Sequence, residues 1–207
     1  PPFALANSQE DAGSIGHGYA PCTKPQKRTD GKLEWHFSAP NVHDFAWAAD
    51  PDYTHVTAQV PGGPLLRFIY EGQGENAPGW KELPGYMVKH FQYMKDHFGA
   101  YMYPQFTFAQ GGDGGMEYPN LTLVTGGKRL GGLVSVSVHE SVHNWYYGML
   151  ASDEGSFPWM DEGFTEYATS EVMDHLFPGQ AKGRLHQDAL ETYLRLAESD
   201  QHEPMSI

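Results

Sequence analysis

The sequence predicts an α+β protein in which a small mixed sheet is followed by helices. Two observations support this class. Short runs of alternating or aromatic residues occupy residues 33–70 and are separated by turn sequences such as PGGP at residues 61–64, a pattern typical of β-strands. From residue 80 onward, longer segments place apolar residues three or four positions apart, which is typical of amphipathic helices.

Composition limits what the chain can bind. Its 207 residues are 40% hydrophobic and 14% aromatic, which is enough to build a core. The net charge of -13 argues against nucleic-acid binding and favours cationic or amine-bearing ligands. Because Cys22 is the single cysteine, neither an internal disulfide nor a thiolate cluster can form, and any metal must be held by His, Asp or Glu.

The N-terminal region carries no recognisable targeting signal. The opening residues PPFALANSQE lack the basic start and apolar core of a signal peptide, and no apolar run in the chain approaches the roughly 18 residues of a transmembrane helix. We therefore expect a soluble chain without a transmembrane segment, while its compartment and oligomeric state stay open. Residues 1–32 are rich in Gly, Pro, Ser and Lys, which indicates loop, and the chain opens without methionine, so we expect a fragment.

Four strands and one helix are predicted in the first half of the chain. The strand sequences are short, apolar or alternating, and bounded by turn residues. They are LEWHFSAP (33–40), DFAWAA (44–49), HVTAQV (55–60) and LLRFIY (65–70). The helix follows at residues 80–98, where apolar residues recur at helical spacing before a glycine stop: Met87, Phe91, Met94 and Phe98, then Gly99.

A glycine-rich loop between two strands is predicted next. The strands are YMYPQFTFAQ (101–110) and NLTLVTG (120–126), and the loop is GGDGGMEYP (111–119). Three further helices complete the prediction, at residues 131–150, at about 161–177 and at about 181–198. The first of these also fits strand alternation at its start, but an i, i+4 stripe continues beyond the point where alternation fails: Leu130, Val134, Val138 and Val142.

The sequence HESVH, beginning at His139, is the candidate catalytic segment. On a helix, His139 and His143 lie one turn apart on the same face, so both imidazoles can bind one metal ion. Glu140 lies about 100° round the helix, from which it can reach a metal-activated water without binding the metal. Two ligands and a general base are the physical content of an HExxH motif. A helix with two solvent-facing histidines fits the same pattern.

A catalytic zinc needs a third protein ligand and an open fourth position. Glu162 follows His143 with eighteen residues between them, and it lies at the start of the next predicted helix, in WMDEGFTEYA. A loop of this length can return Glu162 to the two histidines. A surface glutamate favoured by the helix dipole fits the same position.

The strings VHESVHNWYYGML and WMDEGFTEYA resemble the zinc-site sequence of the aminopeptidase N family, the gluzincin zinc metallopeptidases that include leukotriene hydrolase. The resemblance implies that His139, His143 and Glu162 bind one Zn2+ and that Glu140 is the general base. It also implies a thermolysin-like catalytic domain, in which a small mixed sheet packs on the HExxH helix and the following helices.

Three further residues of the same strings bear on the resemblance. Trp145 matches an aromatic residue of the family, and Asp161 stands where the family usually has asparagine. Glu166, one turn after Glu162, could hold the ring of a zinc-binding histidine through a hydrogen bond. A solvated helix residue fits Glu166 equally well.

Upstream, the sequence GGMEY resembles the Gly-Ala-Met-Glu-Asn exopeptidase signature of the family. Glycines let an edge-strand backbone approach a peptide closely, and a carboxylate can pair with a free α-ammonium. The resemblance implies that Gly114, Gly115 and Met116 contact the substrate and that Glu117 holds its N-terminus. Gly115 replaces the usual alanine and Tyr118 the usual asparagine, and a glycine-rich turn with an exposed glutamate also fits.

The resemblance extends over about residues 35–207. It implies that residues 1–62 hold a loop-rich segment and the closing β-strands of an N-terminal β domain. Residues 63–207 would then be the thermolysin-like catalytic domain, truncated at its C-terminal end. The family's oxyanion-stabilising tyrosine lies further downstream, and Tyr193 comes too early to replace it, so we expect reduced activity.

The function that the resemblance implies is a zinc-dependent aminopeptidase acting on peptides with a free N-terminus. A thermolysin-like endopeptidase shares the helix pair and the distal glutamate, and cleavage of an N-terminally blocked peptide would reveal it. A non-catalytic peptide-binding or scaffold relative also stays open. The presence of all four zinc-site residues argues against such a loss of chemistry.

Overall fold

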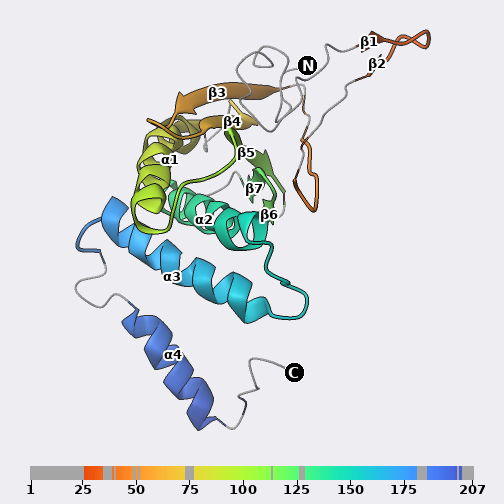
Figure 1. Cartoon of the computed structure of the whole chain (residues 1–207). Coiled ribbons are helices and arrows are strands. Elements are labelled where there is room, and N and C mark those ends of the chain that lie inside the picture. The colour runs from red at the N-terminus through yellow and green to blue at the C-terminus, as the bar shows by residue number, and fades with distance from the viewer. Residues whose placement is uncertain are drawn as a thin grey trace.

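The computed structural model describes residues 26–34, 39, 41–48, 50, 52–72, 77–112, 114–125, 129–180, 186–199 and 201. A five-stranded mixed sheet lies at its centre, with the strand order β3-β4-β5-β7-β6 (Figure 1). The middle strands β4, β5 and β7 are parallel, and the outer strands β3 and β6 run antiparallel to their neighbours. The strands are β3 (Tyr53–Gln59), β4 (Leu65–Glu71), β5 (Gln105–Gly111), β6 (Gly115–Tyr118) and β7 (Leu121–Thr125), with a separate antiparallel pair, β1 (Gln26–Lys27) and β2 (Leu33–Glu34).

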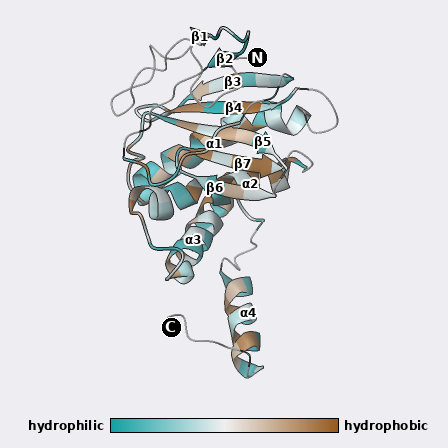
Figure 2. Cartoon of the chain, turned by 90° about the vertical axis from the view of Figure 1, so that its right-hand side faces the viewer, coloured by the Kyte–Doolittle hydropathy of each residue, from teal (hydrophilic) through white to brown (hydrophobic). Residues whose placement is uncertain are grey.

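The helices lie mainly on one side of this sheet. Helix α1 connects β4 to the parallel strand β5, as a parallel crossover requires, and both α1 and α2 pack on the same sheet face (Figures 1 and 2). Helix α3 packs on α2, whereas α4 lies apart and has no buried residues. The helices are α1 (Ala77–His97), α2 (Leu130–His143), α3 (Pro158–Leu176) and α4 (Gln187–Glu198), and a π-helical segment, Asn144–Met149, continues α2. Of the helices described, none is both long and apolar enough to cross a bilayer.

The core fills the space between the sheet and the helices. Phe68 and Phe108 stack on neighbouring strands with ring centroids 5.1 Å apart. Phe91 of α1 contacts Phe108 and also Trp145, a residue of the π-helical segment that continues α2. Burying each such side chain stabilises the fold by about 1.5–3 kcal/mol. This packing fixes α2, the helix that carries HESVH, against the sheet.

The helices expected from apolar periodicity are confirmed. Residues Trp80, Leu83, Met87 and Met94 of α1 are fully buried. The third predicted helix begins earlier, at Pro158, because proline suits the first helical position. The fourth begins at Gln187, and residues 181–185 of its predicted span lie outside the described residues.

The strand predicted in DFAWAA is wrong. Residues 44–48 form no strand, but Ala46 and Ala48 pack against Ile69 and Ala109 on the second face of the sheet. The apolar pattern of this segment therefore comes from covering a sheet, not from pairing with it. Of LEWHFSAP, only Leu33–Glu34 is described as strand, and residues 35–38 lie outside the described part.

The glycine-rich loop predicted at residues 111–119 is also corrected. Residues Gly115–Tyr118 form the edge strand β6, which pairs with β7 through a tight turn at Asn120, where φ is +65°. At the other edge, β3 precedes the predicted domain boundary at residue 62, yet it pairs with β4 along its whole length. The sheet thus starts before that boundary, and the division into domains stays a prediction.

Candidate active site

Three side chains from two helices converge at one end of α2. The Nε2 atoms of His139 and His143 lie 3.2 Å apart, and Oε2 of Glu162 lies 3.4 Å from the first and 3.6 Å from the second. Glu162 directly follows the first turn of α3, which returns along α2 after the intervening loop. His143 is buried, whereas Glu162 is 60% exposed, so the group opens toward solvent. We call these three residues the metal-ligand group.

The spacing of these atoms fits a tetrahedral zinc site. Zinc bonds to nitrogen and oxygen are about 2.0–2.2 Å long, so two ligand atoms of a tetrahedron lie about 3.3–3.6 Å apart. The distances of 3.2, 3.4 and 3.6 Å in the metal-ligand group agree with this value. Two imidazole nitrogens and one carboxylate oxygen are also a donor set that suits Zn2+ and leaves one position for water.

The ring of His143 is fixed by an aspartate that the sequence analysis gave no role. Its Nδ1 lies 2.7 Å from Oδ1 of Asp161, and Oγ1 of Thr165 lies 3.3 Å away. Burial lowers the pKa of His143, but the hydrogen bond and charge of Asp161, with the charges of Glu117 and Glu162, raise it overall. A carboxylate accepts, so Nδ1 carries the proton and Nε2 keeps its lone pair for a metal. In the sequence, the position of Asp161 directly before Glu162 is the signal from which this role could have been predicted.

Glu166 lies beside Nδ1 of His139, as Asp161 lies beside Nδ1 of His143. Its Oε2 lies 3.3 Å from Nδ1 of His139, and its side chain is 66% exposed. Both histidines of the metal-ligand group thus have a carboxylate at Nδ1, one buried and one in solvent. The arrangement is the one in which a carboxylate sets the ring orientation of a metal ligand.

Glu140 lies beside the metal-ligand group in contact with β6. Burial, followed by the negative charge of Glu117, raises the pKa of Glu140 to about 7. The positive charge of a bound Zn2+ would lower it again. A methyl group added at Gly115 would overlap Oε1 of Glu140 and would lie 2.7 Å from its Cδ. The absence of a side chain at Gly115 therefore makes room for this carboxylate.

The edge strand β6 brings the predicted substrate residues to the same place. A carboxylate oxygen of Glu117 lies within 4.8 Å of the nearest donor atoms of His143, Asp161 and Glu162. Gly114 and Met116 are tied to β7, since Gly114 N–H donates to the Thr125 hydroxyl and the Met116 carbonyl accepts from Thr122.

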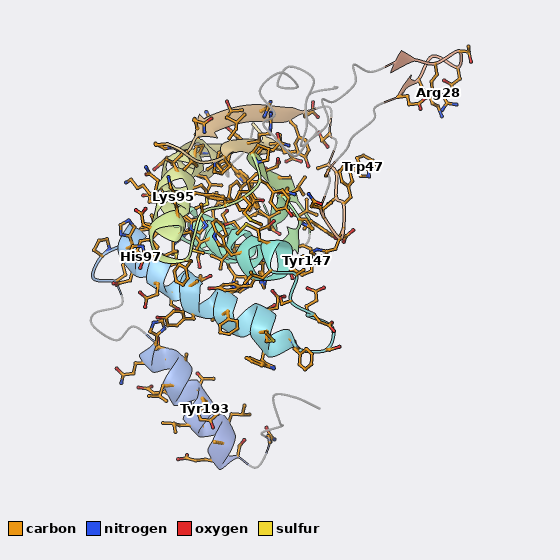
Figure 3. The ribbon with its side chains drawn as sticks, viewed as in Figure 1. Arg28, Trp47, Lys95, His97, Tyr147 and Tyr193 are labelled. Atoms are coloured by element: carbon orange, nitrogen blue, oxygen red, sulfur yellow. The ribbon has the colours of Figure 1, made fainter. Side chains whose placement is uncertain are left out.

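Asn144, which the sequence did not single out, joins this strand to the end of α2. Oδ1 of Asn144 accepts a hydrogen bond from Asn120 N–H at 2.8 Å, and its Nδ2 donates to the Tyr118 carbonyl at 3.2 Å. Asn144 directly follows His143, so the turn between β6 and β7 is held next to a candidate ligand. Tyr193, in contrast, lies on α4 with its side chain 63% exposed (Figure 3).

The fold is that of the catalytic domain of M1 zinc metallopeptidases. The M1 zinc metallopeptidase of Deinococcus radiodurans matches with a TM-score of 0.61 and 19% identity, over 90% of this chain and 42% of that one. A variant of that enzyme bound to a Tyr-Ser-Ala substrate matches with a TM-score of 0.60 and 18% identity, over 89% and 42%. Yeast LTA4 hydrolase matches with a TM-score of 0.52 and 18% identity, over 72% and 24%.

These similarities concern the fold, because the identities are low. The chain spans less than half the length of the enzymes it matches. Neither a protein-family profile nor a curated protein sequence matches the chain.

Proposed function

We propose that the chain is a zinc-dependent aminopeptidase, which hydrolyses the first peptide bond of substrates with a free N-terminus. The observation that carries the proposal is the metal-ligand group, in which His139, His143 and Glu162 present three donor atoms at the spacing of zinc ligands. The M1 fold supports it, since the similar Deinococcus enzyme is a zinc metallopeptidase with a bound peptide substrate.

Glu140 is the proposed general base. When bound, zinc supplies a Lewis acid that polarises the scissile carbonyl and lowers the pKa of water. The Glu140 carboxylate takes a proton from the attacking water and returns it to the departing amine. Its position between β6 and the metal-ligand group suits both transfers. Asp161 and Glu166 hold the two histidine rings through Nδ1.

Glu117 sets where the substrate begins. Its carboxylate lies beside the metal-ligand group and pairs with the α-ammonium of the peptide. Within the described residues β6 pairs only with β7, so a peptide can lie along its outer edge as an added strand. Gly114, Gly115 and Met116 then contact the first residues of that peptide.

The test compares two peptides of one sequence, one with a free N-terminus and one acetylated, using the zinc-loaded chain. We expect release of the first residue from the free peptide only. Glu140→Gln should lower kcat by about 10²- to 10⁴-fold while retaining zinc, and Glu82→Gln, an exposed substitution on α1, should match the wild type. Equal cleavage of the acetylated peptide would indicate an endopeptidase instead. Peptide binding without any cleavage would indicate a scaffold relative.

A further inference from the structure

The turn between β6 and β7 is held by a side chain from outside the sheet. Asn144 is only 1% exposed and is the first residue of the π-helical segment that follows His143. Its Oδ1 accepts a hydrogen bond from the Asn120 N–H at 2.8 Å, and its Nδ2 donates one to the Tyr118 carbonyl at 3.2 Å. Both ends of the amide thus bind the backbone of one turn, and Figure 1 shows the two strands beside α2.

This turn lacks the geometry that two-residue hairpins favour. Pro119 and Asn120 are its central residues, and Asn120 has a φ of +65°. The favoured turns have positive φ at the first central residue, a conformation that the ring of Pro119 excludes. At the other end of β6, Gly114 and Gly115 add backbone freedom. A strand of four residues between such ends depends on contacts outside the hairpin for its position.

The proposed anchor of the substrate, Glu117, lies one residue before the carbonyl that Asn144 holds. Because side chains alternate along a strand, Glu117 points to the same face as Gly115, which contacts Glu140 of α2. A carboxylate oxygen of Glu117 lies within 4.8 Å of the nearest donor atom of His143. Asn144 directly follows His143. A proposed zinc ligand and the side chain that holds the end of β6 are therefore neighbours in the chain.

We propose that Asn144 is a positioning residue for the substrate N-terminus. It fixes β6 against α2, so that the Glu117 carboxylate receives the α-ammonium at a set distance from the metal-ligand group. The inference rests on the proposed function, because Asn144 acts through a group that the proposed reaction uses and touches neither substrate nor metal itself. A misplacement of about 1 Å in such a group can lower the rate about 10²-fold.

Two variants disturb Asn144 to different extents. Asn144→Ala removes both of its hydrogen bonds to the turn. Gly148→Ala keeps them but adds a methyl 3.1 Å from Oδ1 and 3.4 Å from Cβ and Cγ of Asn144, so the amide must shift by a few tenths of an ångström. Tyr101→Phe is the matched control. It removes a different buried hydrogen bond from the same turn, which the Tyr101 hydroxyl donates to Oδ1 of Asn120, and leaves the two bonds of Asn144 in place.

Binding of leucinamide and N-acetyl-leucinamide, measured by calorimetry on the zinc-loaded chain, tests the inference without turnover. The two ligands differ in the α-ammonium, so the ratio of their affinities reports the contact with Glu117. Partial unfolding would lower both affinities equally and leave this ratio unchanged. We expect a ratio of about tenfold or more in the wild type, about threefold or less in Asn144→Ala and an intermediate ratio in Gly148→Ala.

Two quantities should stay constant in this series. Tyr101→Phe should keep the wild-type ratio. The zinc dissociation constants of all four chains should agree within about twofold, because the carboxylate that holds the ring of His143 is unchanged.

The outcomes separate this inference from the proposed function. A wild-type ratio in a folded Asn144→Ala chain would overturn the inference and leave the aminopeptidase standing. Equal losses in Asn144→Ala and Tyr101→Phe would also overturn it, because the turn as a whole would then be responsible. A wild type without a preference for leucinamide would refute both the role of Glu117 and the inference. A chain that shows the expected ratios but cleaves no peptide would support the positioning role and refute the enzyme alone.

Discussion

Nδ1 of His143 donates a hydrogen bond to Oδ1 of Asp161 across 2.7 Å, and both side chains are buried. The bond fixes the histidine ring so that its other nitrogen, Nε2, faces Glu162. Both side chains are almost fully buried where α2 and α3 pack together, so solvent screens this pair little. It is therefore the support on which the metal-ligand group most depends.

Removing this support should weaken zinc binding. Asp161→Ala is expected to raise the zinc dissociation constant about 10- to 100-fold, measured by competition with a chelator of known affinity. Asp161→Asn keeps an oxygen acceptor for Nδ1 and should lose less. Unchanged affinity in a folded Asp161→Ala chain would show that Asp161 serves packing only.

Glu166 should matter less than Asp161. Its carboxylate lies 3.3 Å from Nδ1 of His139 but is mostly in solvent, where water and salt screen the interaction. Glu166→Gln should therefore weaken zinc binding only a few-fold in the same competition assay, and the effect should shrink at high salt. A loss larger than that of Asp161→Ala would contradict this ranking of the two carboxylates.

Gly115→Ala should disturb Glu140 without unfolding the chain. The new methyl would meet the end of the Glu140 side chain, which can rotate away at little cost. We expect the free energy of unfolding to change by less than about 0.5 kcal/mol. We expect kcat to fall by no more than a few-fold, because the family that the sequence resembles usually has alanine at this position beside its glutamate base.

Gly131→Ala is the control for that substitution, since Gly131 is in the same helix as Glu140 and has nothing within 4 Å of an added methyl. It should keep full kcat and gain up to about 1 kcal/mol of stability. A loss of more than about 10²-fold in Gly115→Ala would show that Glu140 cannot adjust its position beside an alanine.

His90 should make the fold sensitive to acid. Its Nε2 donates to the Ser141 hydroxyl at 2.9 Å, because that hydroxyl itself donates to the Ser137 carbonyl. Burial lowers the pKa of His90 to about 3 from 6.5. Between these two values the unfolded chain binds the extra proton, so this contribution to stability is complete above pH 6.5 and falls as the pH drops.

Denaturation of the metal-free chain at pH 7.5 and 5.0 measures this effect. The wild type should lose about 2 kcal/mol from His90 over that interval, and His90→Gln should lack this part of the loss. His97→Gln, an exposed substitution on the same helix, should follow the wild type. Equal pH dependence in the wild type and His90→Gln would contradict a buried neutral histidine.

Much of the fold could be predicted because periodicity is local. The apolar spacing of Met87 and Met94 marks α1, and the stripe through Val134 and Val138 marks α2. DFAWAA could not be predicted correctly because its apolar residues cover a sheet whose second face only the folded chain creates. The glycines of GGMEY predict a loop, but antiparallel pairing with β7 makes this segment an edge strand.

The candidate site also has contacts that the sequence predicts and contacts that only the folded chain creates. The sequence predicts the meeting of His139 with His143 because both are on one helix, one turn apart. The approach of Glu162 to the two histidines depends on the loop before α3, and it was predicted from the resemblance to the aminopeptidase N family. The contact of Gly115 with Glu140 joins a strand to a helix. No spacing within the sequence reports such a contact.

The zinc content of the purified 207-residue chain tests the central claim most directly. After equilibration with zinc and removal of the excess, we expect about one zinc per chain, and much less in Glu162→Ala, with circular dichroism showing that both chains are folded. Zinc bound equally by the two chains would contradict the assignment of Glu162. A folded wild-type chain that binds no zinc would contradict the metal-ligand group itself.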